Sequence, residues 1–422
     1  TMKQINLFFY SSVSIYALLI CLNPKLASIF LGVVIVFTLL KITSNPNTYC
    51  QIVFQKKIVL LTPILFFILT SISFLFTTDD YLTFKSLGKK VWFVFLPLFF
   101  FWLHPKVLVK IKKYSLNALT LGAFLSSFYL LVNLVIMHYN LNKAWVFDKS
   151  ILDYFHTGFH FTAPLDIHPT YLGLFISLSL AYIIIEKPLK NLWLSIIFKL
   201  VILITILFLA SRIIYALAIL LFLVSLVQTL NKSYKNNHKN GIFLIVISLI
   251  LILSTLGILS KTYIGYRMTK ETYWDLTSED FNQKNLINKQ DSRLSRWKVA
   301  IDLIKDIPFF GYGAGTEKYH LVSEYNKRNM KLAADKQYGA HSQFISYFLE
   351  FGIFGFLIFI HFLIINIFYA LKSKSFLGAF FFISLFFSSL FENIFNNNSG
   401  IVFIAFFSVV FTYTTFNKNI SG

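Results

Sequence analysis

Long apolar runs separated by short polar stretches make up most of the chain. About twelve of these runs are long enough, or nearly so, to cross a bilayer whose hydrocarbon core is about 30 Å thick. They fall at about residues 6–22, 26–41, 58–76, 91–103, 115–137, 169–185, 192–209, 213–229, 241–260, 344–370, 376–390 and 400–415. The run at 91–103 is short for a span, so it either extends into Phe84–Lys90 or is re-entrant. The pattern predicts an all-α integral membrane protein with about 12 transmembrane helices.

The composition agrees with lipid as the solvent. Of the 422 residues, 57% are hydrophobic and 13% are charged, and the mean hydropathy is +0.69, which no soluble domain of this length would show. The formal net charge of +20 does not indicate nucleic acid as a partner, because most lysines lie in short loops between apolar runs. The two cysteines, Cys21 and Cys50, are far from any pair of histidines, so neither a disulfide framework nor a metal site is expected.

The distribution of lysines predicts the orientation of the chain. Loops rich in lysine face the cytoplasm, and here they alternate along the chain. The lysines concerned are Lys41, Lys56, Lys57, Lys106, Lys110, Lys112, Lys113, Lys187, Lys190, Lys232, Lys235, Lys239, Lys372 and Lys374. Both termini are then cytoplasmic, and residues 138–168 and 261–340 lie outside. Three parts follow, namely residues 1–260 with spans 1–9, an outer loop at 261–340, and residues 341–422 with spans 10–12.

The tightest outer connection carries an arginine. Ala210-Ser211-Arg212-Ile213 separates two apolar runs almost without a loop, so Arg212 lies at or just under the membrane interface. Such an arginine can anchor a helix by reaching towards water. Alternatively, its rigid guanidinium binds a phosphate group, which it does better than a lysine.

The outer loop contains a further helix pattern. One amphipathic face is formed by Arg293, Trp297, Ala300 and Ile301, and the helix should end near Pro308. A surface salt bridge from Arg293 to Asp291 or Asp302 is the alternative to a role in binding.

A glycine motif follows this helix. Gly311-x-Gly313-x-Gly315 lacks the strand-turn-helix setting of a dinucleotide-binding fingerprint. The motif therefore predicts a sharp backbone bend.

Four other ionisable groups lie near or within apolar runs. His341 precedes the long run at 344–370, at the outer mouth of a helix, where it serves either as a reactive group or as a structural hydrogen-bonding residue. Glu350 lies deeper in this run and needs a partner, which we expect to be an interhelical hydrogen bond; His361 should lie close to the same helical face. His168 precedes Pro169 and is expected to cap the sixth span.

Taken in order, these pieces resemble the O-antigen ligase and polymerase superfamily of bacterial envelope glycan enzymes. The residues that carry the resemblance are Ser211-Arg212, Arg293-x-x-x-Trp297-x-x-Ala300, Pro308-x-x-Gly311-x-Gly313-x-Gly315, and Ala340-His341-Ser342-Gln343 leading into Gly352-Ile353-Phe354-Gly355. The resemblance covers about the last half of the chain. Many relatives have Asn after the histidine, where this chain has Ser342, which can still donate and accept a hydrogen bond.

The resemblance implies a GT-C-like fold and a glycosyl transfer reaction. Relatives transfer a glycan from an undecaprenyl-pyrophosphate carrier to an acceptor hydroxyl at the periplasmic side of the inner membrane, without a metal, nucleotide sugar or other cofactor. In this chain Arg212 and Arg293 would stabilise the pyrophosphate leaving group, and His341 would be the base. In-line displacement would invert the anomeric configuration.

Four further residues are expected to contact substrate. Arg296 is the reserve choice for the second phosphate ligand, because Arg293 and Arg296 are neighbours on one helix face. Trp297 and Ser342 belong to the same motifs, and His168 is expected on the acceptor side.

The acceptor is left open by the sequence. A ligase uses a sugar of the lipid A-core, a polymerase uses the next lipid-linked repeat, and a related oligosaccharyltransferase uses a protein Ser or Thr. The single compact outer segment favours the ligase. A transporter or flippase would instead show repeats and several charges deep within the spans, whereas Glu350 is the one clear acid well inside a span. Membrane lipids are expected partners in every case.

Overall fold

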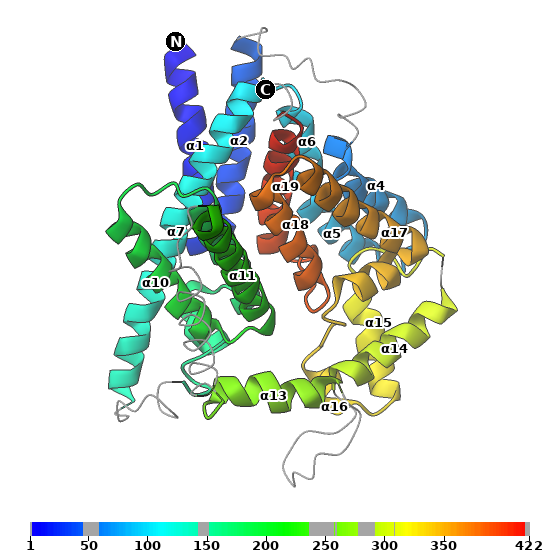
Figure 1. The fold of residues 1–422 in the computed structure, drawn as a ribbon. Helices are drawn as coiled ribbons and strands as arrows, with labels where there is room; N and C mark the ends of the chain where they lie inside the picture. Colours follow the sequence, from blue (N-terminus) through cyan, green and yellow to red (C-terminus); the bar gives the residue numbers. More distant parts are fainter. Residues whose placement is uncertain are drawn as a thin grey trace. The chain divides into compact units, whose positions relative to one another are not determined.

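The computed structural model describes residues 2–44, 59–141, 152–235, 257, 260–276, 292–307 and 309–417. Within these ranges all regular elements are helices, without a β-strand, so the all-α class is confirmed (Figure 1). The chain divides into two compact units. One comprises Thr1–Ile20, Pro24–Ala118 and Trp274–Gly422, and the other comprises Cys21–Asn23 and Leu119–Tyr273.

The first unit contains both ends of the chain. Its elements are α1 (Met2–Leu22), α2 (Pro24–Ser44), α4 (Ile64–Ile72), η2 (Ser73–Leu75), α5 (Asp80–Lys90), α6 (Trp92–Phe100), the start of α7 (Pro105–Asn140), α14 (Arg293–Asp306), α15 (Glu317–Lys327), α16 (Lys331–Asp335), α17 (Gln343–Lys372), α18 (Phe376–Ser389) and α19 (Asn398–Asn417). The second contains the rest of α7, α8 (Phe159–Thr162), η3 (Ala163–Leu165), α9 (Pro169–Ile185), α10 (Leu192–Leu209), α11 (Arg212–Lys235) and most of α13 (Tyr263–Leu276).

Several helices have the length and composition of membrane spans. Six of those described qualify, namely Lys3–Leu22, Pro24–Ser44, Pro105–Asn140, Leu192–Leu209, Gln343–Lys372 and Asn398–Thr415. The pair Phe159–Leu165 and Pro169–Ile185, bent by 77°, would make a seventh if it is one span. The predicted run at 241–260 lies almost entirely outside the described residues. The helices fit a multi-pass membrane protein, and the number of twelve spans stays a prediction.

Two predicted runs have different boundaries in the structure. Helix α7 begins at Pro105 rather than near residue 115, so the lysines from Lys106 to Lys113 lie in its first turns and not in a loop. The run at 91–103 forms only the nine-residue helix α6, with Pro97 inside it. Val91, between α5 and α6, has helical backbone angles (φ −56°, ψ −30°). The choice between an extension into Phe84–Lys90 and a re-entrant segment stays a prediction.

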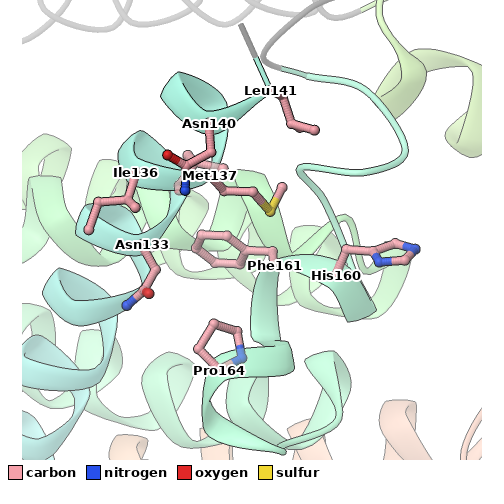
Figure 2. Close-up of a pocket in the computed structure, with 9 residues that line it drawn as sticks. Asn133, Ile136, Met137, Asn140, Leu141, His160, Phe161 and Pro164 are labelled. Carbon is pink, nitrogen blue, oxygen red and sulfur yellow. The ribbon is translucent and has the colours of Figure 1, made fainter. Parts of the chain in front are cut away.

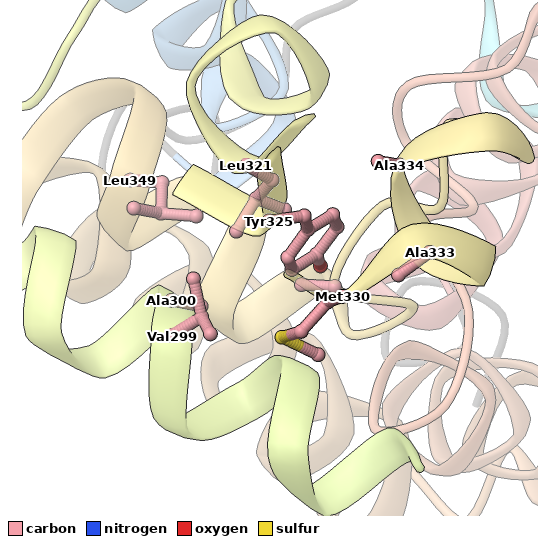
Figure 3. Packing of buried hydrophobic residues seen from close by; sticks show 9 residues of the cluster. Val299, Ala300, Leu321, Tyr325, Met330, Ala333, Ala334 and Leu349 are labelled. Carbon is pink, nitrogen blue, oxygen red and sulfur yellow. The ribbon is translucent and has the colours of Figure 1, made fainter. Parts of the chain in front are cut away.

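A hydrophobic cluster joins α14, α15 and α16 to α17 (Figure 3). Val299 and Ala300 of α14 meet Leu321 and Tyr325 of α15, with Leu349 of α17 in the same cluster; its remaining buried members are Met330, Ala333, Ala334 and Ala340. Burial of these apolar side chains holds α14 against the beginning of α17.

The buried face of α14 differs from the predicted one. Ala300 is buried as expected, but Ile301 is 47% exposed and Arg296 is only 6% exposed. Arg296, Val299 and Ala300 are spaced three and four residues apart, so they form the stripe that packs on the neighbouring helices.

Helix α17 is broken at Gly352, where φ is +63° and ψ is −156°. In an unbroken helix, the carbonyl groups of Leu349 and Glu350 would accept hydrogen bonds from the amides four residues later. Here they accept instead from the backbone N–H groups of Tyr312 (2.8 Å) and Gly313 (2.9 Å). The loop after α14 thus satisfies the carbonyl groups that the break sets free.

The glycines of the motif permit this close approach of two backbones. Gly311, Gly313 and Gly315 have φ values of +72°, +102° and +79°, a region that L side chains rarely adopt. A Cβ atom at Gly311 would lie 2.5 Å from the Leu349 carbonyl oxygen, and one at Gly352 would lie 2.1 Å from the Phe309 carbonyl oxygen. The predicted sharp bend is confirmed.

Two ionisable residues of α17 lie on either side of the break. Glu350 is buried and its Oε1 accepts a hydrogen bond from Asn396 Nδ2 (3.0 Å), so the expected partner exists, although it lies in the loop before α19. His361 is exposed, and the prediction that it shares a face with Glu350 is wrong, because the helical periodicity is interrupted at Gly352.

We expect Gly352→Ala to destabilise the protein by about 2 kcal/mol or more, since alanine meets both an unfavourable φ and the Phe309 carbonyl. Gly88→Ala is the matched control, because Gly88 lies in α5 with nothing within 4 Å of the added atom. This control should leave stability unchanged or raise it by up to about 1 kcal/mol. Thermal unfolding in detergent measures both; equal stability of the two variants would contradict the account of the break.

Candidate functional site

His341 lies two residues before the first residue of α17, in a left-handed backbone conformation (φ +50°). Its Nδ1 is 3.5 Å from Oε2 of Glu392, and the two side chains are 32% and 17% exposed. A carboxylate beside one ring nitrogen can orient the imidazole. His341 is therefore a partly accessible histidine with an acid next to one ring nitrogen.

Glu392 was missed by sequence reasoning. It lies in the loop between α18 and α19, while α17 and α18 pack side by side so that the end of α18 meets the start of α17. The signal in the sequence is simple, because Glu392 is the only acidic residue after Glu350. The residues around Glu392, however, give no indication that its side chain lies next to a histidine that precedes α17.

Helix α14 holds the segment that leads to His341. Trp297 Nε1 donates a hydrogen bond to the Ala340 carbonyl oxygen (2.7 Å), and Arg296 Nη1 donates to that of Gly339 (3.5 Å). The Arg296 guanidinium also lies over the ring of Tyr338, 4.7 Å from its centroid. Burial lowers the pKa of Arg296 from its ordinary value, but a guanidinium remains charged at physiological pH. Both side chains thus have a structural contact with the backbone before His341.

Arg293 reaches the same region from the first turn of α14. Ser292 caps this helix by accepting a hydrogen bond from the amide of Ser295 (3.2 Å). The Arg293 guanidinium carbon lies 6.0 Å from the ring centroid of Phe391, the neighbour of Glu392. Its Nε is buried and has no hydrogen-bond partner among the residues that the structure describes. Arg293 and His341 therefore both lie against the segment Phe391–Glu392.

The salt bridge predicted as the alternative for Arg293 does not form with Asp302. Asp302 instead binds Arg328 (2.9 Å) and Lys305 (3.2 Å), and the hydrogen bond from Arg328 holds the pKa of Asp302 below its ordinary value. Asp291 lies outside the described residues.

Arg212 belongs to the second unit. Ala210 ends α10 in a left-handed conformation (φ +47°) and α11 begins at Arg212, so the predicted tight connection is confirmed. Arg212 Nη2 lies 3.8 Å, and Arg267 Nε 3.9 Å, from the same Oε2 of Glu271. Two guanidinium groups thus lie beside one carboxylate. Arg267 was missed, although its spacing of four residues from Glu271 on α13 indicates a helical ion pair.

His168 caps α9 as predicted. Its Nδ1 accepts a hydrogen bond from the amide of Thr170 (3.2 Å). The ring packs edge-on against Phe159 (4.5 Å between centroids) and Tyr171 (5.4 Å). A role towards an acceptor stays a prediction.

The second unit also has a cavity of about 330 Å³ beside the end of α7. Figure 2 shows its lining side chains from α7 on one side and His160, Phe161 and Pro164 on the other. None of the predicted site residues lines it. Among the described residues, no three His, Cys, Asp or Glu side chains are grouped so that they could hold a metal ion.

The helices fit a multi-pass membrane protein, and His341, Glu392 and Arg293 lie at or beside the ends of its helices. Residues 197–360 match the family model described as O-antigen ligase. This match, which contains Arg212, Arg293, Trp297 and His341, confirms the resemblance to the O-antigen ligase superfamily that the order of the motifs gives. Members are glycosyltransferase-like enzymes with lipid-linked glycan substrates. A comparison with curated proteins gives no match.

The contacts of the two arginines on α14 predict different effects of substitution. Arg296→Met should lower the free energy of unfolding by about 1–3 kcal/mol, because a buried carbonyl loses its donor and Tyr338 loses its cation. Arg293→Met should change it by less than about 0.5 kcal/mol. Thermal unfolding in detergent compares the two variants. An equal loss of stability in both would contradict the view that Arg296 stabilises the fold whereas Arg293 does not.

Proposed function

We propose that the protein is a membrane glycosyltransferase of the O-antigen ligase type. It transfers a glycan from undecaprenyl pyrophosphate to a sugar hydroxyl of the lipid A-core, at the periplasmic face of the bacterial inner membrane. The observation that carries the proposal is the pair of His341 and Glu392 at the start of α17, next to Arg293. The family match supports the reaction class.

His341 acts as the general base. Its Nδ1 side faces Glu392, so Nε2 is the nitrogen that accepts the proton of the attacking sugar hydroxyl. The hydroxyl oxygen forms the new bond to the anomeric carbon, the bond from that carbon to the pyrophosphate oxygen breaks, and undecaprenyl pyrophosphate leaves. Glu392 stabilises the imidazolium ion that results. Attack opposite to the leaving group inverts the anomeric configuration.

The arginines stabilise the leaving group. Negative charge grows on the pyrophosphate as the bond breaks, and fixed cations aimed at this charge lower the barrier. Arg293 offers a buried N–H without a partner among the described residues, and Arg212 offers one of the two guanidinium groups that share Glu271. Arg296 is less suited to this role than the sequence predicted, because its contacts are to the backbone before His341.

Trp297 and Ser342 are proposed to act mainly through the position of His341. Trp297 donates to the residue before His341, and Ser342, the residue after it, is the N-cap position of α17. His168 remains the proposed contact on the acceptor side.

The acceptor separates this proposal from its alternatives. The family match supports a polymerase, which joins two lipid-linked repeats, equally well. The purified protein, reconstituted with a lipid-linked glycan, should be given lipid A-core, a second lipid-linked repeat, or a peptide with Ser and Thr. Transfer to lipid A-core alone supports the ligase, and elongation of the lipid-linked glycan identifies a polymerase. Transfer to the peptide identifies an oligosaccharyltransferase, whereas a proton-driven flux without any transfer identifies a transporter.

In the same assay, His341→Ala should reduce transfer by about 10²–10⁴-fold, because it removes the base. Arg293→Ala and Arg212→Ala should each reduce it by about 10²–10³-fold. His361→Ala and Arg328→Ala are the matched controls, since His361 is exposed on α17 and Arg328 binds surface acids. Wild-type transfer by the His341 variant would refute the proposed base, and wild-type transfer by an arginine variant would refute that arginine's role.

A further inference from the structure

Glu317 is a buried carboxylate to which neither the sequence motifs nor the proposed reaction assigns a role. It is the first residue of α15 and is only 4% exposed. Its Oε1 accepts a hydrogen bond from the backbone amide of Ala340 (2.7 Å). Its Oε2 accepts from Ser346 Oγ (2.7 Å) and from Asn393 Nδ2 (2.8 Å). Three short hydrogen bonds compensate the cost of burying the charge.

The partners of Glu317 flank both members of the proposed catalytic pair. Ala340 directly precedes His341, and Asn393 directly follows Glu392. Ser346 lies in the first turn of α17. One carboxylate therefore joins the segment that carries the histidine to the segment that carries its acid.

Glu317 is itself held by the glycine loop. Thr316, its neighbour, donates from Oγ1 to the Gly313 carbonyl oxygen (2.8 Å). The Gly313 amide in turn donates to the backbone carbonyl oxygen of Glu350 in the broken helix. The Glu317 carboxylate also lies close to the backbone of Gly339, because a Cβ atom added there would be 3.0 Å from Glu317 Oε1. The carboxylate thus has little freedom to move.

Further hydrogen bonds extend the same connection. Asn396 Nδ2 donates to Ser346 Oγ (2.8 Å), and Gln343 Nε2 donates to Asn396 Oδ1 (3.2 Å). The amide of Phe395 donates to Gln343 Oε1 (2.8 Å). The loop after Glu392 is therefore fixed to the first turns of α17 through side chains that are mostly buried.

We propose that Glu317 is a positioning residue for the transfer reaction. It keeps His341 and Glu392 in a fixed position relative to each other. The proposal rests on the proposed function of this pair. Glu317 touches neither member directly and acts through the residues on either side of them. Since a displacement of about 1 Å can cost a reaction about 10²-fold, a group that fixes both segments affects the rate without binding substrate.

Glu317→Gln tests the proposal with little change of shape. The new NH₂ group must face either the Ala340 amide or the Asn393 amide, both donors, so one hydrogen bond is lost in either orientation. We expect kcat to fall by about 10–10²-fold, the KM for the lipid-linked donor to stay within about two-fold, and the melting temperature to fall by less than about 5 °C. Unchanged kcat in the folded variant would overturn the proposal.

Glu324→Gln is the matched control on the same helix. Glu324 binds the side chains of Arg328 and Lys327 at the surface, so this change should leave kcat at the wild-type value. The double variant Glu317→Gln/His341→Ala should be no slower than His341→Ala alone, because there is then no base to position. A fully additive loss would show that Glu317 acts apart from His341 and would overturn the proposal.

A second readout does not depend on transfer. Modification of His341 by diethyl pyrocarbonate, followed by mass spectrometry, should be at least about three-fold faster in Glu317→Gln than in wild type, because its segment opens more readily. His361 of the same molecule serves as the internal reference. If wild type transfers no glycan to any acceptor, the proposed function fails, but the modification rate still tests whether Glu317 holds the segment of His341. An unchanged modification rate in Glu317→Gln would overturn the role proposed for Glu317.

Two further variants apply if Glu317→Gln does not fold. Asn393→Ala and Ser346→Ala each remove one donor to the carboxylate and leave the charge in place. Each should lower kcat and raise the rate of His341 modification, both by less than is expected for Glu317→Gln. Wild-type values of both in both variants would overturn the proposal.

Discussion

The break in α17 at Gly352 leaves two buried carbonyl groups that must find donors from elsewhere in the chain. The amides of Tyr312 and Gly313 supply them. This pairing fixes where the chain leaves the glycine loop, and thereby where α15 begins and where Glu317 lies. The arrangement around His341 thus depends on the general requirement that buried backbone groups be paired.

The groups proposed for chemistry lie on short segments rather than within the long helices. His341 precedes α17, Glu392 follows α18, and Arg293 begins α14. Segments of this kind are mobile unless other groups hold them. Here α14 holds the first segment through Trp297, and a buried carboxylate joins it to the second. The helices provide a rigid frame to which these segments are tied at several points.

The sequence predicted what depends on local pattern. Apolar runs indicated most of the long helices, the His168-Pro169 pair indicated a helix cap, and the glycine motif indicated a bend. It could not indicate pairings between distant segments, so Glu392, Glu317 and Arg267 were missed. The face of α14 was misjudged for a related reason. An arginine looks like a surface residue until the structure shows Gly339 and Tyr338 beside it.

The double hydrogen bond between the loop and α17 also restricts the length of the chain around it. Consecutive amides, Tyr312 and Gly313, meet consecutive carbonyl groups, Leu349 and Glu350. An insertion or deletion of one residue between Gly313 and Glu317 would preserve this pairing but rotate the carboxylate away from Ala340. Loops usually tolerate such length changes. In this protein, the stretch between the glycine motif and α15 is a place where loop length is as constrained as residue identity.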